Sequence, residues 1–213
     1  MDKCDDNNIN VSITKNELAT LPVAAYHGNI HVVDSEEDAI KAVEVLAAES
    51  VIGFDTETKP SFKRGQSNNV ALLQLSTHTD CYLFRLNHIG LPEVVRNLLE
   101  TEDVLKIGLS IHDDFHNLRK IYELEPKGFI DLQNYVKYYD IADNSLSRIY
   151  GILFGRRISK GHRLTNWEAA DLTPNQQNYA ALDALACIQI YEYLSKGRFN
   201  PEESPYLRDN ENQ

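Results

Sequence analysis

Cysteine is scarce and scattered in this chain of 213 residues. Only Cys4, Cys81 and Cys187 occur, and no two of them form a Cys-x-x-Cys pair. An odd, widely spaced set argues against a disulfide framework and against a structural zinc site. The pattern is typical of a protein in a reducing compartment, with no disulfide partner.

Long apolar runs and a secretory leader are also missing. The first eight residues are polar and contain no apolar core of a signal peptide. No uninterrupted apolar run approaches the roughly 18 residues that cross a bilayer. We therefore expect a soluble intracellular protein without membrane contact, cytoplasmic, or nuclear if the source is eukaryotic. Apolar residues make up 42% of the chain, so it can build a core, which excludes a disordered or fibrous protein.

Positive charge is in short supply as well. The chain has 21 Lys and Arg against 32 Asp and Glu, and its net charge is −11. Such a chain should avoid phosphate backbones unless it has a local basic face or carries metal cations. The total charge alone therefore argues against nucleic acid as a partner.

The length predicts one domain with short flanking segments. Residues 1–27 are polar and poorly periodic, and we expect a loosely packed N-terminal arm there. Residues 198–213 contain two prolines and several acids, which predicts an acidic C-terminal tail. The compact domain is then expected over residues 28–197.

Within that domain, short apolar runs alternate with helical patterns. Short connections between the second, third and fourth runs favour antiparallel hairpins, and the later alternation favours an α/β fold. We predict a mixed sheet of five to six strands flanked by helices. The expected strands are 30–33, 51–55, 70–75, 81–84, 104–109 and 128–132, and the expected helices include 36–49, 91–100, 113–122 and 174–194.

Two acids end the most apolar of these strands. Asp55 and Glu57 follow Val51–Phe54 and, being two residues apart, point to the same face of the strand. Partly buried neighbouring carboxylates repel each other and need cations or raised pKa values. The structural alternative is that this Asp-x-Glu sequence only ends the strand before a polar turn.

A third acid interrupts the apolar face of the last predicted helix. Thr173, Pro174 and Gln176 form a capping box with proline at the first helical position. Asp183 then shares a face with Tyr179, one turn earlier. The alternative is a buried Tyr–Asp hydrogen bond that only stabilises the helix.

A fourth group of polar residues follows the strand at 104–109. Asp113 and Asp114 begin a helix, where acids stabilise its positive end without any further role. His112 and His116 have the spacing of zinc ligands, but Asp113 replaces the glutamate that a metalloprotease helix needs, and no third ligand follows. A zinc hydrolase is therefore disfavoured.

Taken together, three blocks resemble the DEDDy branch of the 3′–5′ exonuclease superfamily, which has a ribonuclease H-like fold. The blocks are 51–57, 106–118 and 178–184, and Asn166-Trp167 precedes the third. The resemblance covers roughly residues 30–196 and is closest to Werner syndrome exonuclease-like stand-alone domains, more distantly to ribonuclease D. Asp114, not Asp113, matches the second block, because an apolar Leu118 follows it by four.

The resemblance implies five catalytic residues, namely Asp55, Glu57, Asp114, Tyr179 and Asp183. It implies two divalent cations, Mg²⁺ or Mn²⁺, which oxygen-only sites suit. Asp55 would bridge both ions, Glu57 and Asp183 would complete the first, and Asp114 would support the second. Tyr179 would orient the attacking water.

Two loops without acids are candidates for contact with nucleic acid. The residues expected to bind it are Lys59, Phe62, Lys63, Arg64, Arg156, Arg157, Lys160, Arg163 and Trp167. Phe62 could stack on a base. The alternative is that these loops are only solvated. The first block departs from the family pattern, since Thr58-Lys59 follows Glu57 where many relatives have an aromatic residue, which leaves open how the terminal base is held.

The leading hypothesis is thus a 3′–5′ exonuclease that acts on 3′ ends of DNA, single-stranded or recessed, and releases nucleoside 5′-monophosphates. An RNA 3′-end trimming exonuclease is an alternative within the same class. The alternative of another class is a catalytically idle scaffold that binds nucleic acid or a protein partner.

Overall fold

The fold is built on a six-stranded mixed sheet, as the sequence predicts. The computed structural model describes residues 10–61, 68–159, 161 and 164–208. Strand order across the sheet is β2-β5-β4-β3-β6-β7. The strands are β2 (Asn29–Val33), β3 (Val51–Thr58), β4 (Val70–Ser76), β5 (Asp80–Phe84), β6 (Leu105–Gly108) and β7 (Phe129–Asp131).

The pairing confirms the predicted hairpins. β3 is antiparallel to β4, and β4 is antiparallel to β5. The other neighbours, β2 with β5, β3 with β6 and β6 with β7, are parallel. The central position of β3, whose residues Ile52 and Phe54 are fully buried, explains its nearly continuous apolar run.

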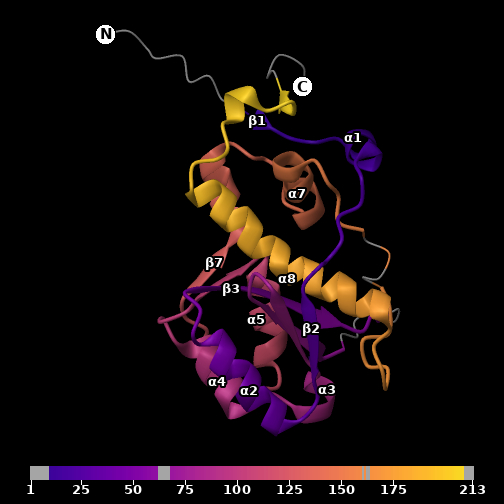
Figure 1. Ribbon diagram of the computed structural model, residues 1–213, viewed down its shortest axis with the longest axis vertical. Coiled ribbons are helices and arrows are strands. Elements are labelled where there is room, and N and C mark those ends of the chain that lie inside the picture. The colour runs from indigo at the N-terminus through magenta and orange to yellow at the C-terminus, as the bar shows by residue number, and fades with distance from the viewer. Residues whose placement is uncertain (1–9, 62–67, 160, 162–163, 209–213) are drawn as a thin grey trace.

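Helices cover both faces of the sheet (Figure 1). On one face, α2 (Glu36–Leu46), α4 (Glu93–Glu100) and α5 (Ile111–Arg119) share an apolar cluster with β3 and β4. On the other face, α7 (Leu146–Phe154) and the long α8 (Pro174–Ser195) form a second cluster. The short helices α3 (Leu86–Ile89) and α6 (Leu132–Tyr135) and the 3₁₀ turns Val136–Tyr139 and Pro201–Glu203 complete the connections.

The start of α8 is as the sequence predicts. The Thr173 hydroxyl accepts from the backbone N–H of Gln176 at 3.3 Å, and the Gln176 side chain accepts from the backbone N–H of Thr173 at 3.0 Å. This reciprocal capping box satisfies N–H groups that an α-helix leaves free.

The N-terminal segment is not the loosely packed arm that we expected. β1 (Asn10–Val11) and α1 (Lys15–Thr20) pack on the body, and Val11 and Ile13 are at most 1% exposed. The prediction failed because this segment buries a few isolated apolar side chains along an irregular path, which produces no periodicity. The packed segment comprises residues 10–27, and residues 1–9 lie outside the described part of the chain.

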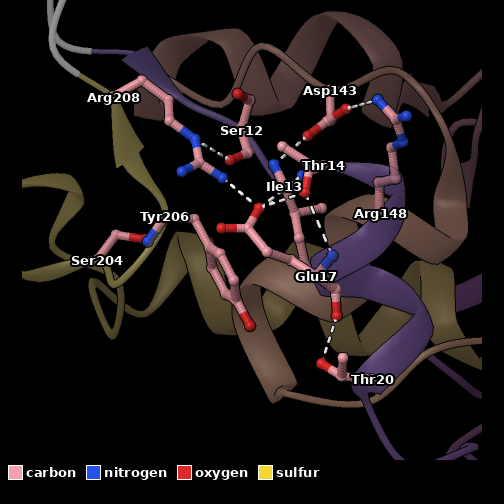
Figure 2. A network of polar contacts seen from close by, with 10 residues as sticks. All are labelled: Ser12, Ile13, Thr14, Glu17, Thr20, Asp143, Arg148, Ser204, Tyr206 and Arg208. Atoms are coloured by element: carbon pink, nitrogen blue, oxygen red, sulfur yellow. Dashed lines mark hydrogen bonds and ion pairs between the residues drawn. The ribbon is translucent and has the colours of Figure 1, made fainter.

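The expected C-terminal tail is packed as well, as far as Arg208. β8 (Leu207–Arg208) pairs antiparallel with β1. Figure 2 shows the polar network that joins the two segments: the Arg208 guanidinium binds Glu17, and its Nε donates to the Ser12 carbonyl at 2.9 Å. The Ile13 N–H donates to Asp143 at 2.8 Å, which ties the same segment to the loop before α7.

No helix in the described ranges combines the length and apolar character of a membrane span. Cys81 and Cys187 are buried free thiols, and Cys4 lies outside the described residues.

Candidate active site

The crossing of α8 over β3 determines where the site lies. At the crossing point, a Cβ added to Gly53 would lie 1.9 Å from the carbonyl oxygen of Ala184. Only glycine therefore permits this approach of helix backbone to strand. Because Asp183 precedes Ala184 and Asp55 follows Gly53 by two, the close approach brings their carboxylates together.

Three acids form a compact cluster at this crossing. Carboxylate oxygens of Asp55, Glu57 and Asp183 all lie within 4.8 Å of one another. Glu57 is 7% exposed and Asp183 is 6% exposed. The common face that the sequence predicted for Asp55 and Glu57 is therefore the face that α8 covers.

Burial raises the pKa values of two acids in this cluster, Asp55 and Asp183. Desolvation, and then the charges of Asp183, Asp114 and Glu57, hold the pKa of Asp55 well above its usual range. Desolvation raises the pKa of Asp183 to about 7, although a hydrogen bond from Tyr179 acts in the opposite direction. Such a cluster is unfavourable unless a proton or a cation balances its charge.

Tyr179 lies one helical turn before Asp183, and its hydroxyl donates a hydrogen bond to that carboxylate. Burial and the adjacent acids raise the pKa of Tyr179, so the phenol remains protonated and acts as a hydrogen-bond donor. Its ring packs against the indole of Trp167, with the ring centroids 6.1 Å apart.

Asp114 is near this cluster but is not a member of it. The hydroxyl of Thr56, on β3 between Asp55 and Glu57, donates to the Asp114 carboxylate. Desolvation raises the pKa of Asp114 to about 7, and its charge contributes to the raised pKa of Asp55. The side chain of Asp113, in contrast, is 85% exposed. The geometry thus favours Asp114 over Asp113 as the second-block acid.

The donor set of the site suits a hard divalent cation. Its ligands are carboxylate oxygens, which Mg²⁺ and Mn²⁺ prefer. Desolvation raises the pKa values of Asp55 and Asp183, and for Asp55 the neighbouring acids add to it, so a bound cation would stabilise their charged forms. Zinc is not favoured, because the side chain of His112 is 92% exposed and is not part of the acid cluster.

A cavity of about 330 Å³ opens beside these acids. Its lining also includes polar residues that the sequence did not single out, namely Gln133, Asn144, Ser145, Ser147 and Ser159. The Ser147 hydroxyl donates to the Ile158 carbonyl at 2.9 Å and so joins α7 to the following loop. Isolated serines and amides carry no sequence signal, because they are common in every loop.

Of the four described residues that were expected to contact nucleic acid, three are buried or bonded to other groups of the protein. Trp167 is completely buried, so the expectation that it contacts nucleic acid is wrong: its ring supports Tyr179 instead. Lys59 forms an ion pair with Glu168 at 3.0 Å. Arg157 donates from Nε to the Leu21 carbonyl at 3.2 Å, which anchors the N-terminal segment, whereas Arg156 is exposed. Phe62, Lys63, Arg64, Lys160 and Arg163 lie outside the described residues.

Known proteins resemble this chain in sequence. Residues 30–197 match the model of a 3′–5′ exonuclease family. The mouse bifunctional 3′–5′ exonuclease/ATP-dependent helicase WRN is 31% identical over 161 residues, covering 70% of this chain and 11% of that protein.

Two solved structures share the fold. The EXO domain of Aedes aegypti Nibbler superimposes with a TM-score of 0.72 at 24% identity, covering 85% of this chain and 97% of the other. Escherichia coli RNase D, an exoribonuclease involved in structured RNA processing, gives a TM-score of 0.71 at 20% identity, covering 79% and 44%. Curated relatives are much longer, since the chain spans 11–27% of the length of three of them.

Proposed function

Because the chain belongs to the 3′–5′ exonuclease family, we propose that it hydrolyses the last phosphodiester bond at the 3′ end of a DNA strand and releases a nucleoside 5′-monophosphate. One observation carries the proposal: the Asp55, Glu57 and Asp183 carboxylates converge within 4.8 Å beside a cavity that Tyr179 also lines. An idle scaffold would have no need for so unfavourable a group of buried acids.

Two divalent cations, Mg²⁺ or Mn²⁺, are part of the proposal. Asp55, Glu57 and Asp183 would hold one of them, and Asp55 with Asp114 would hold the other. When bound, such ions polarise the phosphodiester and lower the pKa of water. The carboxylates supply the negative charge that keeps them in place.

The remaining chemistry belongs to the protein. Tyr179 stays protonated and donates its single O–H in a hydrogen bond to Asp183, so its oxygen would orient the attacking water by accepting a hydrogen bond from it, and the phenol does not act as a base. Asp183 fixes the phenol by accepting from it. Ser147 and Ser159, which line the same cavity as the acids, would contact the end of the strand.

The choice of DNA rests on the resemblance to Werner syndrome exonuclease-like domains. RNA is the second candidate, because the fold is also that of an exoribonuclease. The experiment therefore offers the purified chain 5′-labelled single-stranded DNA, recessed-end DNA and RNA side by side, with Mg²⁺, Mn²⁺ or EDTA.

We expect a ladder of products shortened from the 3′ end on DNA, dependent on the cation and abolished by Asp55→Asn. Asp113→Asn is the matched control, since it removes an exposed acid next to Asp114. Faster shortening of RNA would transfer the proposal to the second candidate. If the folded wild type leaves all three substrates intact, the chain is the scaffold that the proposal excludes.

A further inference from the structure

Arg85 is a buried cation two strands away from β3, the strand that carries Asp55 and Glu57. It directly follows β5, and 2% of its surface is exposed. Its guanidinium donates to the carbonyls of Ala169 and Ala170, at 3.3 Å for the latter, and lies 3.3 Å from Nε2 of His88. Across the described residues its hydrogen-bond partners are therefore two backbone carbonyls and an imidazole.

Burying a guanidinium beside these neutral partners costs free energy, so a role for Arg85 is expected. Desolvation lowers the pKa of Arg85, although the charges of Asp34 and Asp171 act in the opposite direction, so burial disfavours its charged form. An apolar side chain of similar length would fill the same space without this penalty. The cost of burying the guanidinium points to a role for the segment that it holds.

That segment, residues 164–173, has no regular secondary structure and runs beside the start of α8. The Gln176 amide donates to Oγ1 of Thr165 at 3.0 Å and to the Asn166 carbonyl at 3.3 Å. The Gln177 amide donates to the Leu172 carbonyl at 2.9 Å. Both ends are thus fastened by α8, and Arg85 fastens the middle.

The middle of the segment is the part that reaches the active site. Trp167, two residues before Ala169, is fully buried against the ring of Tyr179. Its neighbour Glu168 holds Lys59, which lies just after Glu57 and Thr58, at 3.0 Å. A displacement of residues 167–170 would therefore change the support of Tyr179 first.

We propose that Arg85 is a positioning residue for catalysis, which holds residues 169 and 170 so that Trp167 keeps the hydroxyl of Tyr179 in place. The inference rests on the proposed exonuclease function for its kinetic consequence. Its structural part, the link from Arg85 to Trp167, stands independently of any activity.

Trp167 makes that link measurable, because it is the only tryptophan of the chain. In Arg85→Met the segment loses its donor, and we expect the tryptophan emission to shift to longer wavelength and acrylamide to quench it more strongly. In Arg85→Lys, which keeps a donor of similar reach, both changes should be partly reversed.

Lys106→Met is the matched control. Lys106 is also a fully buried cation that donates to backbone carbonyls, those of Leu98 at 3.2 Å and Thr101 at 2.5 Å, neither of which belongs to residues 164–173. Its replacement should leave the emission of Trp167 and the value of kcat unchanged. An equal emission change in Lys106→Met would overturn the proposal, since the effect would then be general loosening.

The kinetic test separates positioning from stability. We expect Arg85→Met to lower kcat on a DNA oligonucleotide about tenfold, with KM within about twofold, as for a misplaced catalytic group. In a Tyr179→Phe background the same substitution should have little further effect on kcat.

Additive losses of kcat in the double variant would overturn the proposal, and so would an unchanged Trp167 emission in Arg85→Met. If Arg85→Met does not fold, Arg85→Lys carries the same tests with smaller changes. A wild type inactive on every nucleic acid would contradict the proposed function, whereas the emission measurements would still decide whether Arg85 holds Trp167.

Discussion

At the scale of single residues, the site depends on groups whose protonation states the fold has shifted. Tyr179 is the clearest case, because its raised pKa makes it a permanent donor at neutral pH. Helical spacing predicted that Tyr179 and Asp183 share a face, and the family resemblance implied their catalytic roles. The sequence could not show that Trp167 supports Tyr179 from inside the protein, since an indole next to a basic loop could equally have stacked on a base.

Removing the Tyr179 hydroxyl should affect the reaction and leave the fold intact. We expect Tyr179→Phe to lower kcat about 10- to 100-fold, as for the loss of an orienting hydrogen bond, while the ring still packs on Trp167. Tyr138→Phe is the control, because Tyr138 is 84% exposed. Full activity of Tyr179→Phe in steady-state assays would mean that the phenol does not orient the reaction.

Asp183 gives a prediction with a definite sign in pH. Its folded pKa is raised from 3.8 to about 7, so its ionisation opposes folding without metal, increasingly as pH rises above 3.8. In EDTA, Asp183→Asn should therefore be more stable than wild type at pH 8, with the advantage disappearing near pH 4. With Mn²⁺ the order should reverse, because only the intact cluster gains from binding the ion.

Urea denaturation with and without Mn²⁺ measures both effects. Asp113→Asn, which alters an exposed acid, should follow wild type throughout. A wild type that is no less stable than Asp183→Asn in EDTA at pH 8 would contradict the account of a strained acid cluster.

At the scale of elements, the sequence predicted what local chemistry specifies. The capping box at Thr173, the antiparallel β3–β4–β5 set and the mixed sheet are all observed. The crossing of α8 over β3 could not be predicted, because no local signal indicates that Gly53 must be small to admit the carbonyl of Ala184, 131 residues later. Residues 10–27 were mispredicted because their buried side chains follow no helical or strand period.

The crossing leads to a prediction of its own. Gly53→Ala would place a methyl group 1.9 Å from the Ala184 carbonyl, so α8 must shift. We expect a loss of unfolding free energy of about 2–3 kcal/mol, as for overpacking, together with a loss of Mn²⁺ binding because Asp183 moves from Asp55.

Gly197→Ala provides the comparison for that measurement. Gly197 has a positive φ of 64° with open space around its Cβ position, so its substitution adds backbone strain alone, on the order of 1 kcal/mol. Chemical denaturation and Mn²⁺ titration of both variants check the idea. Unchanged Mn²⁺ affinity in Gly53→Ala would show that the crossing does not position the acids.

At the scale of the whole molecule, the net charge of −11 first argued against nucleic acid. The structure shows why total charge misled: Asp55, Glu57 and Asp183 are gathered in one buried cluster that suits cations, with Asp114 nearby. A bound pair of divalent ions would offset these four charges. The acidity of the chain is then compatible with metal-dependent binding to the end of a nucleic-acid strand.

The contact between the N-terminal and C-terminal segments contributes to the stability of the fold. The backbone N–H of Thr14 and then Arg208 hold the pKa of Glu17 down, from 4.5 to about 2. A depressed acid pKa means stability that is present above pH 4.5 and lost as pH falls towards 2. Glu17→Gln should therefore lower Tm at pH 7, and the difference from wild type should shrink between pH 4.5 and pH 3.

The control for this contact is Glu37→Gln. Glu37 pairs with Lys41 at 2.7 Å, but both side chains are more than 60% exposed, and such surface pairs contribute little. Equal Tm values for Glu17→Gln and wild type at pH 7 would mean that the contact between the two ends does not stabilise the fold.

If the acid cluster catalyses hydrolysis at a 3′ end, the identity of the first product will show it. Wild type with Mn²⁺ in ¹⁸O-labelled water should release a nucleoside 5′-monophosphate whose phosphate carries one labelled oxygen, as analysed by mass spectrometry. Asp183→Asn should release none. Nucleoside 3′-monophosphates, or internal fragments as the first product, would contradict the account.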